Sequence, residues 1–325
     1  VSGGAKNLNY YVSGGFLNQK GLLKIADDHH NRFYVTAKVN AQITKWLDLN
    51  YSLRWTREEY ERPTYLSGLF FHNIVRRWPT NATHDPNGYI MPNNEGLQLM
   101  DGGRTSREDD YTNQQISLIA HPVKGLTIKA ENNYNTTTYF THVEIFPVYW
   151  HDKDGNPIAA KWDDWKQAGL SEVSEQAQKV NYFSGRYFAE YAREWGKHDF
   201  KVVGGLDLEV RKYRNLSGSK KDIITSEVPT INTATNDKPG LSGGYNHWST
   251  MGMFARVNYA YDSRYLVELS LRRDGSSRFI GDKTWATFPS FSLGWNVANE
   301  DFFKPLKNTI SELKLRGSWG ALGNT

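Results

Sequence analysis

Hydrophobic and polar residues alternate along most of this chain with a period of two. In the segment 32–43, every second residue from Phe33 to Ile43 is apolar, and the residues between them are mainly polar. Alternation of this kind predicts a β-strand with one face in an apolar environment and the other in water. The same pattern recurs in 49–55, 200–210, 251–261, 265–271, 291–297 and 313–319. Weaker alternation near 7–17, 112–121, 126–136 and 180–193 extends the prediction to about eleven strands.

The connections between these segments alternate in length. The short ones are TKWL at 44–47, PVKG at 122–125, EWGKHD at 194–199 and DSR at 262–264. The long ones are 18–31, 60–111, about 137–179, about 216–247 and 274–287, and only 299–312 is longer than its place in the series predicts. Bacterial outer-membrane barrels have short periplasmic turns and long extracellular loops. The pattern therefore favours an all-β fold, an antiparallel transmembrane β-barrel, over a large soluble β-protein.

The chemistry of the two faces agrees with a barrel. Charged residues such as Arg54, Asp207 and Glu268 lie on the polar faces, which fits a wet lumen, while the apolar faces would contact lipid. Aromatic residues make up 14% of the 325 residues, and Trp46 and Tyr265 illustrate how they gather near strand ends. Such aromatic residues form the girdles at the two membrane interfaces. The exception is Asn132, which falls among apolar positions and predicts a bulge or another register there.

Composition removes several classes of function. The net charge is +4, from 39 basic and 35 acidic residues that are interspersed, so no basic stripe predicts a nucleic-acid partner. The chain has no cysteine, which excludes a zinc-thiolate site and a cysteine nucleophile. Adjacent acidic residues such as Glu58 and Glu59 would point to opposite faces of a strand, so they do not form the paired carboxylates of a glycosidase. We predict that the chain is not an enzyme and carries no cofactor.

One short motif resembles a metal site. In HDKDGNP at 151–157, Asp152 and Asp154 lie two residues apart before a glycine, as at the start of a calcium-binding loop. The distal acidic residue of such a loop is missing, and a turn explains the motif more simply. Ca²⁺ binding by Asp152 and Asp154 is therefore the weaker alternative to having no metal.

Several blocks of the chain resemble the SusC/RagA family, the TonB-linked outer-membrane transporters of Bacteroidetes. The blocks are YVSGGFLNQKGL (11–22), RFYVTAKVNAQITKWLDLNYSL (32–53), FARVNYAYDSRYLVELSLRRDGSSRF (254–279), TFPSFSLGWNVANEDFF (287–303) and ISELKLRGSWGALGN (310–324). The match from 254 to 324 is the longest and most specific. The segments 60–111 and 137–179 resemble no known motif.

The resemblance implies a larger protein than this chain. Its relatives have a plug domain inside a barrel of about 22 strands. We therefore expect residues 1–325 to be part of one TonB-dependent receptor barrel domain, with the plug domain, signal peptide and C-terminal strands absent from this stretch. The resemblance also implies integral insertion in the bacterial outer membrane, contact with its lipid, a SusD-like surface lipoprotein as a lid, and TonB acting through the missing N-terminal part.

The resemblance implies nutrient import rather than chemistry. We expect TonB-energised uptake of oligosaccharides together with the SusD-like lipoprotein. An importer of peptides from the same family is one alternative. A passive porin or structural surface barrel is another, and its flux would not depend on TonB.

Aromatic and charged residues are the candidates for substrate binding. Trp150, Trp162 and Trp165 lie in the long connection 137–179, and Trp78 and Trp248 lie in or beside other long connections. Flat aromatic faces stack on sugar rings, although the same residues could instead pack their loops or contact the lid. We also select three charged residues from the polar faces of the predicted strands: Arg256, Glu268 and Arg272.

Overall fold

The computed structural model describes residues 1–92, 94–161 and 168–323. Twelve strands form one antiparallel sheet in the order β1-β2-β3-β4-β5-β6-β9-β10-β11-β12-β13-β14. Their bounds are β1 Ser2–Ala5, β2 Leu8–Lys20, β3 His29–Thr44, β4 Leu47–Pro63, β5 Arg104–Ala120, β6 Leu126–Ile145, β9 Glu172–Trp195, β10 His198–Lys221, β11 Gly240–Tyr261, β12 Tyr265–Ser276, β13 Trp285–Asn296 and β14 Lys314–Gly320. A separate hairpin pairs β7 Tyr149–His151 with β8 Pro157–Ala159. The predicted antiparallel β-fold is confirmed.

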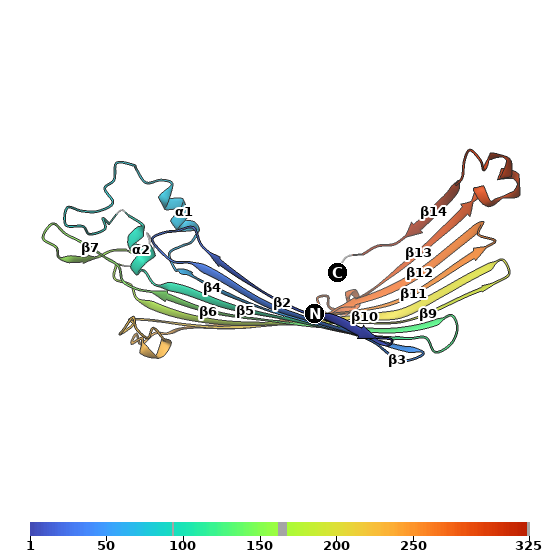
Figure 1. The fold of residues 1–325 in the computed structure, drawn as a ribbon, viewed down its shortest axis with the longest axis horizontal. Coiled ribbons are helices and arrows are strands. Elements are labelled where there is room, and N and C mark those ends of the chain that lie inside the picture. Colours follow the sequence, from blue (N-terminus) through green and yellow to red (C-terminus); the bar gives the residue numbers. More distant parts are fainter. Residues whose placement is uncertain (93, 162–167, 324–325) are drawn as a thin grey trace.

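The sheet is a curved wall with different connections at its two ends (Figure 1). The strands run along the long dimension, and their directions change steadily across the sheet, as strand twist requires. The long connections lie at one end with α1 Gly68–Ile74, α2 Gly96–Asp101 and the β7–β8 hairpin, and the short turns lie at the other. No helix in the described parts of the chain is long and apolar enough to cross a membrane.

The strands are longer and more numerous than the alternation predicted. The prediction of about eleven strands omitted β1, whose SGGA sequence carries no alternation. The segments that follow residues 136 and 215 were predicted to be loops, but β6 continues to Ile145 and β10 to Lys221. The polar residues of these extensions pair regularly with the neighbouring strands. Backbone hydrogen bonds stabilise this pairing, and they do not require alternation of the side chains.

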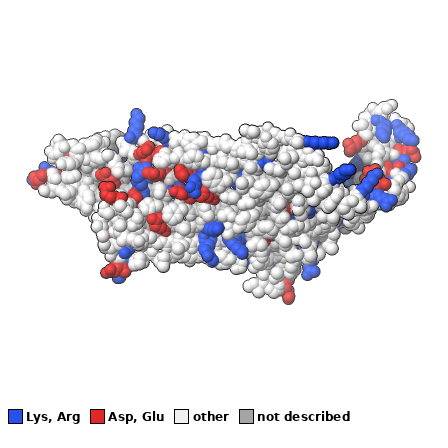
Figure 2. Space-filling model, turned by 60° about the horizontal axis from the view of Figure 1, so that its bottom comes forward, with Lys and Arg blue, Asp and Glu red and all other residues white. Residues whose placement is uncertain are grey.

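The two faces of the sheet differ as predicted. Leu269 and Leu293 are 53% and 55% exposed, and each lies opposite another apolar residue on the neighbouring strand. This apolar face is called the outward face below, and the polar face is called the luminal face. In Figure 2, charged side chains are sparse over the middle of the molecule and gather toward its ends. A surface with few charged side chains is suited to contact with lipid.

Asn132 lies on the outward face without a bulge. The pairing of β6 with β9 runs in continuous register through Asn132 and Gly185. The hydroxyl of Tyr187 donates a hydrogen bond to Oδ1 of Asn132, and its ring lies over Gly185, where a Cβ would collide with it. The predicted bulge is therefore wrong, because a cross-strand tyrosine satisfies the amide in place of a change in register.

The buried apolar core lies in the connections rather than between the strands. Tyr65, Phe70, Leu99 and Ile145 form a buried cluster at the long-loop end. This cluster joins α1 and α2 to the end of β6. A wall with lipid on one side and a wet lumen on the other has no place for a solid core, so burial occurs where the loops fold on themselves.

The long connection 297–313 is an ordered element of the short-turn end. It contains the 3₁₀ helices η3 Val297–Asn299 and η4 Asp301–Leu306, and Val297, Ala298 and Phe303 form its core. Glu300 accepts hydrogen bonds from Nε1 of Trp295 at 2.9 Å and from Nη1 of Arg264 at 3.0 Å. The bonds from Trp295 and Tyr265, aided by Arg264, lower the pKa of Glu300. The extra length thus forms a small folded unit attached to the adjoining turn. Two further 3₁₀ helices, η1 Ile231–Thr233 and η2 Gly281–Thr284, lie in connections at the long-loop end.

Candidate functional site

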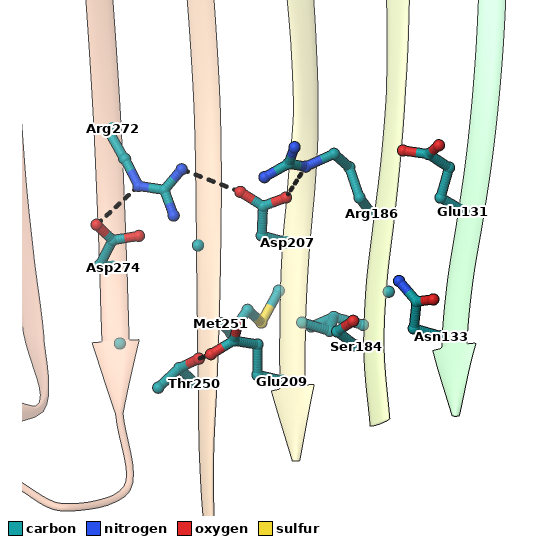
Figure 3. A pocket seen from close by; sticks show the side chains of 14 residues that line it. Glu131, Asn133, Ser184, Arg186, Asp207, Glu209, Thr250, Met251, Arg272 and Asp274 are labelled. Carbon is teal, nitrogen blue, oxygen red and sulfur yellow. Dashed lines mark hydrogen bonds and ion pairs between the residues drawn. The ribbon is translucent and has the colours of Figure 1, made fainter. Parts of the chain in front are cut away.

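A groove on the luminal face crosses β6, β9, β10, β11 and β12 (Figure 3). Its volume is about 470 Å³. Its wall consists mainly of polar side chains: Glu131, Asn133, Ser184, Arg186, Asp207, Glu209, Thr250, Arg272 and Asp274. Antiparallel register brings these residues together, because Glu131, Arg186, Asp207, Gly252 and Asp274 lie opposite one another on successive strands.

Asp207 is the centre of the groove. Nε of Arg186 donates to its Oδ1 at 2.7 Å, and Nη1 of Arg272 donates to its Oδ2 at 3.0 Å. Arg272 also donates from Nε to Oδ2 of Asp274 at 2.8 Å. The side chain of Asp207 is 17% exposed, whereas those of Arg186 and Arg272 are 58% and 42% exposed. The carboxylate is thus held at the base of the groove, and the guanidinium groups remain accessible.

A second carboxylate forms the end of the groove that lies toward the long loops. Glu209 accepts hydrogen bonds from the hydroxyls of Tyr182 at 2.9 Å and Thr250 at 3.2 Å. The ring of Tyr182 contacts that of Trp248, with their centroids 6.4 Å apart. The guanidinium of Arg278 lies 4.6 Å above the Trp248 ring centroid. An aromatic surface therefore adjoins the charged part of the groove.

This arrangement is suited to binding rather than to chemistry. Guanidinium N–H groups donate hydrogen bonds, carboxylates accept them, and hydroxyls do both, so a neutral polar ligand can bind without a change in protonation. The described residues contain no cluster of three or more His, Cys, Asp or Glu side chains suited to a metal ion.

A wider basic surface lies on the luminal side of β2, β3, β4 and β5. It encloses about 900 Å³ and is lined by Tyr11, Ser13, Arg32, Tyr34, Thr36, Lys38, Arg54, Thr56, Glu58 and Tyr111. Glu58 is its one carboxylate, and Nε2 of His30 lies 3.7 Å from Oε2 of that residue. The luminal face thus carries a basic aromatic region as well as the groove of mixed charge.

The three charged residues predicted to bind substrate all lie on the luminal face, but they do not form one site. Arg272 belongs to the groove around Asp207. Arg256 and Arg272 line a neighbouring recess of about 350 Å³. Glu268 lies elsewhere, in a cavity of about 370 Å³ whose lining includes Lys201 and Lys314.

The predicted tryptophans are dispersed. Trp248 is not a loop residue: it lies within β11 and faces the lumen, since the long polar end of β11 is strand. Trp150 is a half-buried residue of β7 and pairs with Ile158 of β8. Trp78 is 75% exposed in the connection after α1. Trp162 and Trp165 lie outside the described residues.

Asp152 and Asp154 form the turn of the β7–β8 hairpin. Oδ1 of Asp152 accepts hydrogen bonds from the backbone N–H groups of Asp154 and Asn156, each at 2.9 Å. Oδ2 of Asp152 accepts a hydrogen bond from the side-chain Nδ2 of Asn156 at 3.0 Å. These bonds, the Asn156 side chain foremost, lower the pKa of Asp152. Both oxygens of Asp152 thus stabilise the turn, which is the simpler of the two predictions for this motif.

Arg186, Asp207, Glu209 and Asp274 were missing from the predicted site. Alternation places Arg186, Asp207 and Glu209 on polar faces, whereas Asp274 falls at the start of the connection predicted at 274–287, which the structure shows to be the end of β12. Which residues of different strands lie opposite one another depends on register, and a polar face alone does not specify it. Asp207 and Arg272, for example, are 65 residues apart in the chain.

The fold and site together define a class of protein. A continuous antiparallel sheet with an apolar outward face, a charged luminal face and long loops at one end is the wall of an outer-membrane β-barrel. Comparison with known proteins agrees, although no family model matches the chain.

Similar proteins include TonB-dependent receptors from two bacteria. TonB-dependent receptor P3 of Formosa agariphila is 27% identical over 336 residues, covering 99% of this chain and 32% of the receptor. TonB-dependent receptor SusC of Bacteroides thetaiotaomicron is 26% identical over 358 residues, covering 99% of this chain and 33% of SusC. The chain thus spans about a third of the length of these curated relatives.

Solved structures share the fold. The RagAB peptide importer in its closed-closed state superimposes with a TM-score of 0.75 at 22% identity, over 100% of this chain and 36% of that one. A second structure of the RagAB peptide transporter gives a TM-score of 0.72, also at 22% identity, over 98% of this chain and 35% of that one.

These comparisons confirm the resemblance to SusC/RagA-type TonB-dependent receptors over nearly the whole chain. The chain is an integral outer-membrane β-barrel segment. The relatives are receptors and transporters, which confirms the prediction that it is not an enzyme.

Proposed function

We propose that this chain forms part of the barrel wall of a TonB-energised nutrient importer, and that the importer takes up oligosaccharides. The observation that carries the proposal is the groove around Asp207. Its donors and acceptors are fixed in place by cross-strand ion pairs, and it opens on the luminal face. Planar guanidinium and carboxylate groups beside an aromatic surface suit the hydroxyl groups and apolar ring faces of sugars.

Of the two proposed partners, only the surface lipoprotein would contact this wall. At the long-loop end, Phe71, Val75 and Trp78 are 58%, 79% and 75% exposed, which supports a docking surface for a SusD-like surface lipoprotein. TonB would act on the plug domain of the complete protein rather than on these strands. Both partners come to this chain by its similarity to SusC and RagAB.

A peptide is the second candidate substrate, and the fixed charges favour it. Arg186 and Arg272 remain partly exposed beside Asp207, and Arg32, Lys38 and Arg54 line the basic luminal surface. Charged side chains or a terminal carboxylate of a peptide would pair with these groups. A neutral oligosaccharide gains hydrogen bonds only, so the two candidates differ in their dependence on salt.

Uptake by the complete transporter in whole cells tests the proposal. The probes are a fluorescently labelled set of neutral oligosaccharides and a labelled set of mixed peptides, each measured with and without TonB. Oligosaccharide uptake that requires TonB supports the proposal, and peptide uptake alone supports the second candidate. Flux that is indifferent to TonB and to the proton-motive force would identify a passive pore.

A matched pair of variants connects uptake to the groove. Arg186→Gln combined with Arg272→Gln removes both donors from Asp207, whereas Lys201→Gln combined with Lys314→Gln removes equal charge from the separate cavity near Glu268. We expect the first pair to weaken uptake more than the second. Equal effects would remove the groove from the transport path.

A further inference from the structure

The outward face changes character at a defined height on β6, β9, β10 and β11. Below this height, β10 presents an apolar series that ends at Val210. Above it, two polar rows cross the four strands. The first row is Thr136, Asn181, Lys212 and His247, and the second is Thr138, Lys179, Arg214 and Tyr245. Lys179, Lys212 and Arg214 are together called the basic belt.

The basic belt lies at the membrane boundary on the long-loop side. The apolar series of β10 runs from Phe200 to Val210, a rise of about 33 Å along the strand. At a strand tilt of about 40° this corresponds to a height of about 25 Å, which is that of the apolar band of an outer-membrane barrel. Trp195 and Tyr261 are 47% and 39% exposed near the lower edge, where an aromatic girdle is expected. Lys212 is therefore the first outward-facing residue of β10 above the hydrocarbon region.

The positive charge of the belt is not neutralised by neighbouring carboxylates. All three side chains are exposed, and among the described residues neither lysine forms an ion pair, while Arg214 lies 5.6 Å from the ring centroid of Tyr245. The rows directly above and below contain no Asp or Glu on these four strands. Asp110 continues the second row on β5, but it is held by Nε and Nη2 of Arg57 at 3.0 and 2.6 Å.

The surroundings of the belt suit an amphipathic anion. Leu216 and Phe140, 58% and 49% exposed, lie in the row above, and Val210 and Tyr134 lie in the row below. Basic side chains at a membrane surface attract the phosphates of lipid headgroups, and arginine binds phosphate through paired N–H donors. Hydroxyls of Thr138 and Tyr245 in the same row can donate further hydrogen bonds.

We propose that the basic belt binds the phosphate of a phosphorylated glycolipid in the outer leaflet, of the lipid A type. Its acyl chains lie along the apolar series below Val210, and its phosphate is held between Lys179, Lys212 and Arg214. This site is on the opposite face of the wall from the groove around Asp207, so it is independent of the transported substrate. It rests on the outer-membrane location of the sheet and on the long loops being outside.

Binding of labelled lipid A to the purified full-length transporter in detergent tests the proposal. The triple variant Lys179→Gln, Lys212→Gln, Arg214→Gln removes the belt. A contribution of about fivefold for each basic residue near a membrane surface predicts binding that is about 100-fold weaker. The matched control is Lys220→Gln, Lys221→Gln, Lys238→Gln, which removes the same charge near the end of β10 and in the following loop. The control should bind lipid A as the wild type does.

Two further arms identify the chemistry. Lipid A stripped of its phosphates should bind the wild type as weakly as phosphorylated lipid A binds the triple variant. Inorganic phosphate at millimolar concentration should not displace the labelled lipid, because it lacks the acyl chains. Displacement by inorganic phosphate would overturn the assignment to a lipid, and undiminished binding of the stripped lipid would overturn the role of phosphate.

Assembly of the variant barrels is checked separately from their binding of lipid A. A charge-preserving variant, Lys179→Arg, Lys212→Arg, Arg214→Lys, keeps the belt basic and should retain binding within a few fold. All variants are compared by the shift in gel mobility that a folded barrel shows before heating. If the triple glutamine variant is folded and binds lipid A like the wild type, the proposal is wrong. If it does not fold, the single variant Lys212→Gln replaces it, with about fivefold weaker binding expected and unchanged binding again contradicting the proposal.

Discussion

Arg272 of β12 reaches across the whole width of β11 to form an ion pair with Asp207 of β10, with Nη1 and Oδ2 3.0 Å apart. Adjacent strands lie about 4.8 Å apart, so two strands with a third between them are separated by about twice that distance. Side chains on such strands therefore rarely meet. The contact exists because the residue between them on β11 is Gly252, which pairs with Asp207 on one side and Asp274 on the other. A Cβ at Gly252 would collide with the Arg272 guanidinium and the Asp274 carboxylate.

Gly252→Val should therefore break the ion pair between Arg272 and Asp207 without preventing barrel assembly. The side chain would displace Arg272 from Asp207, while β-branched residues are favourable in strands. A charge-assisted hydrogen bond in a partly exposed groove contributes about 1.5 kcal/mol, so substrate binding should weaken about tenfold. Isothermal titration of the complete transporter measures this affinity.

Gly204→Val is the control for the glycine substitution. Gly204 lies on the outward face of β10, and a Cβ added there would have the Phe254 carbonyl oxygen as its nearest neighbour at 3.8 Å, an ordinary contact. We expect unchanged substrate affinity for this variant. If both glycine variants bind substrate like the wild type, the Arg272–Asp207 pair does not contribute to binding.

Leu269→Arg should impair assembly far more than Glu268→Arg. Leu269 is 53% exposed on the outward face, where arginine costs about 2–4 kcal/mol near the middle of the membrane. Glu268 lies in a luminal cavity beside Lys201 and Lys314, where water solvates a new charge. Folded and unfolded fractions of each variant can be separated by gel mobility before and after heating. Equal assembly of the two variants would contradict the assignment of the faces.

Epitope tags test which end of the wall is outside the cell. Tags at residues 90, 155 and 235 lie in long connections, and a tag at residue 263 lies in the tight turn between β11 and β12. Asp262 and Ser263 have φ values of 52° and 51°, as expected for the two central residues of a tight type I′ turn, and the N–H of Arg264 donates to the carbonyl of Tyr261 across it. Antibodies should label the first three tags on intact cells and the fourth only after permeabilisation. The reverse result would invert the topology and place the basic belt in the inner leaflet.

Trp248→Ala should weaken oligosaccharide binding before it affects folding. Trp248 packs against Tyr182 and Arg278 on the luminal face rather than within a buried core. Loss of a partly exposed stacking surface is expected to cost about 1–2 kcal/mol, or about five- to thirtyfold in affinity. Trp46→Ala, at the short-turn end, is the matched control and should bind normally. Unchanged affinity for Trp248→Ala would assign the residue to packing.

His142 should make the outer ends of β6 and β9 sensitive to pH. Burial opposes its protonation, but hydrogen bonds to Glu175 at 2.6 Å and Glu144 at 3.1 Å outweigh burial and raise the pKa of His142. A raised pKa means that the stabilisation is complete below the unfolded value of about 6.5 and is lost as the pH rises through the higher folded value.

Hydrogen exchange of the strand ends measures this effect. Exchange rates are first corrected for the intrinsic dependence of amide exchange on pH. Backbone amides near His142 should then exchange up to about fivefold more slowly at pH 6 than at pH 8.5, which is the range expected for a partly exposed ion pair such as His142 with Glu175. His142→Gln should show the same protection at both values. A wild type without any difference would contradict the predicted contribution of the pair.

Alternation along the chain was enough to predict the class of fold and the faces of the strand residues within the apolar band. Leu269 and Glu268 are neighbours in the chain, yet alternation alone placed one on the apolar face and the other on the polar face, as the structure shows. The alternating lengths of the connections likewise predicted the end at which each loop lies. These properties are local, because the alternation within a strand and the length of a connection depend only on residues that are consecutive in the chain.

The groove was decided only by the tertiary structure. Asp207, Gly252 and Arg272 form one constellation because the strands pair in a particular register, and a shift of two residues would keep every face and separate these three side chains. Alternation also stopped predicting strands where β6 and β10 leave the apolar band, so Trp248 and the basic belt were not located beforehand. Beyond the lipid, both faces of a strand contact water, so polar residues are suitable on either face. The alternation of apolar and polar residues therefore ends there, while the backbone pairing of the strands continues.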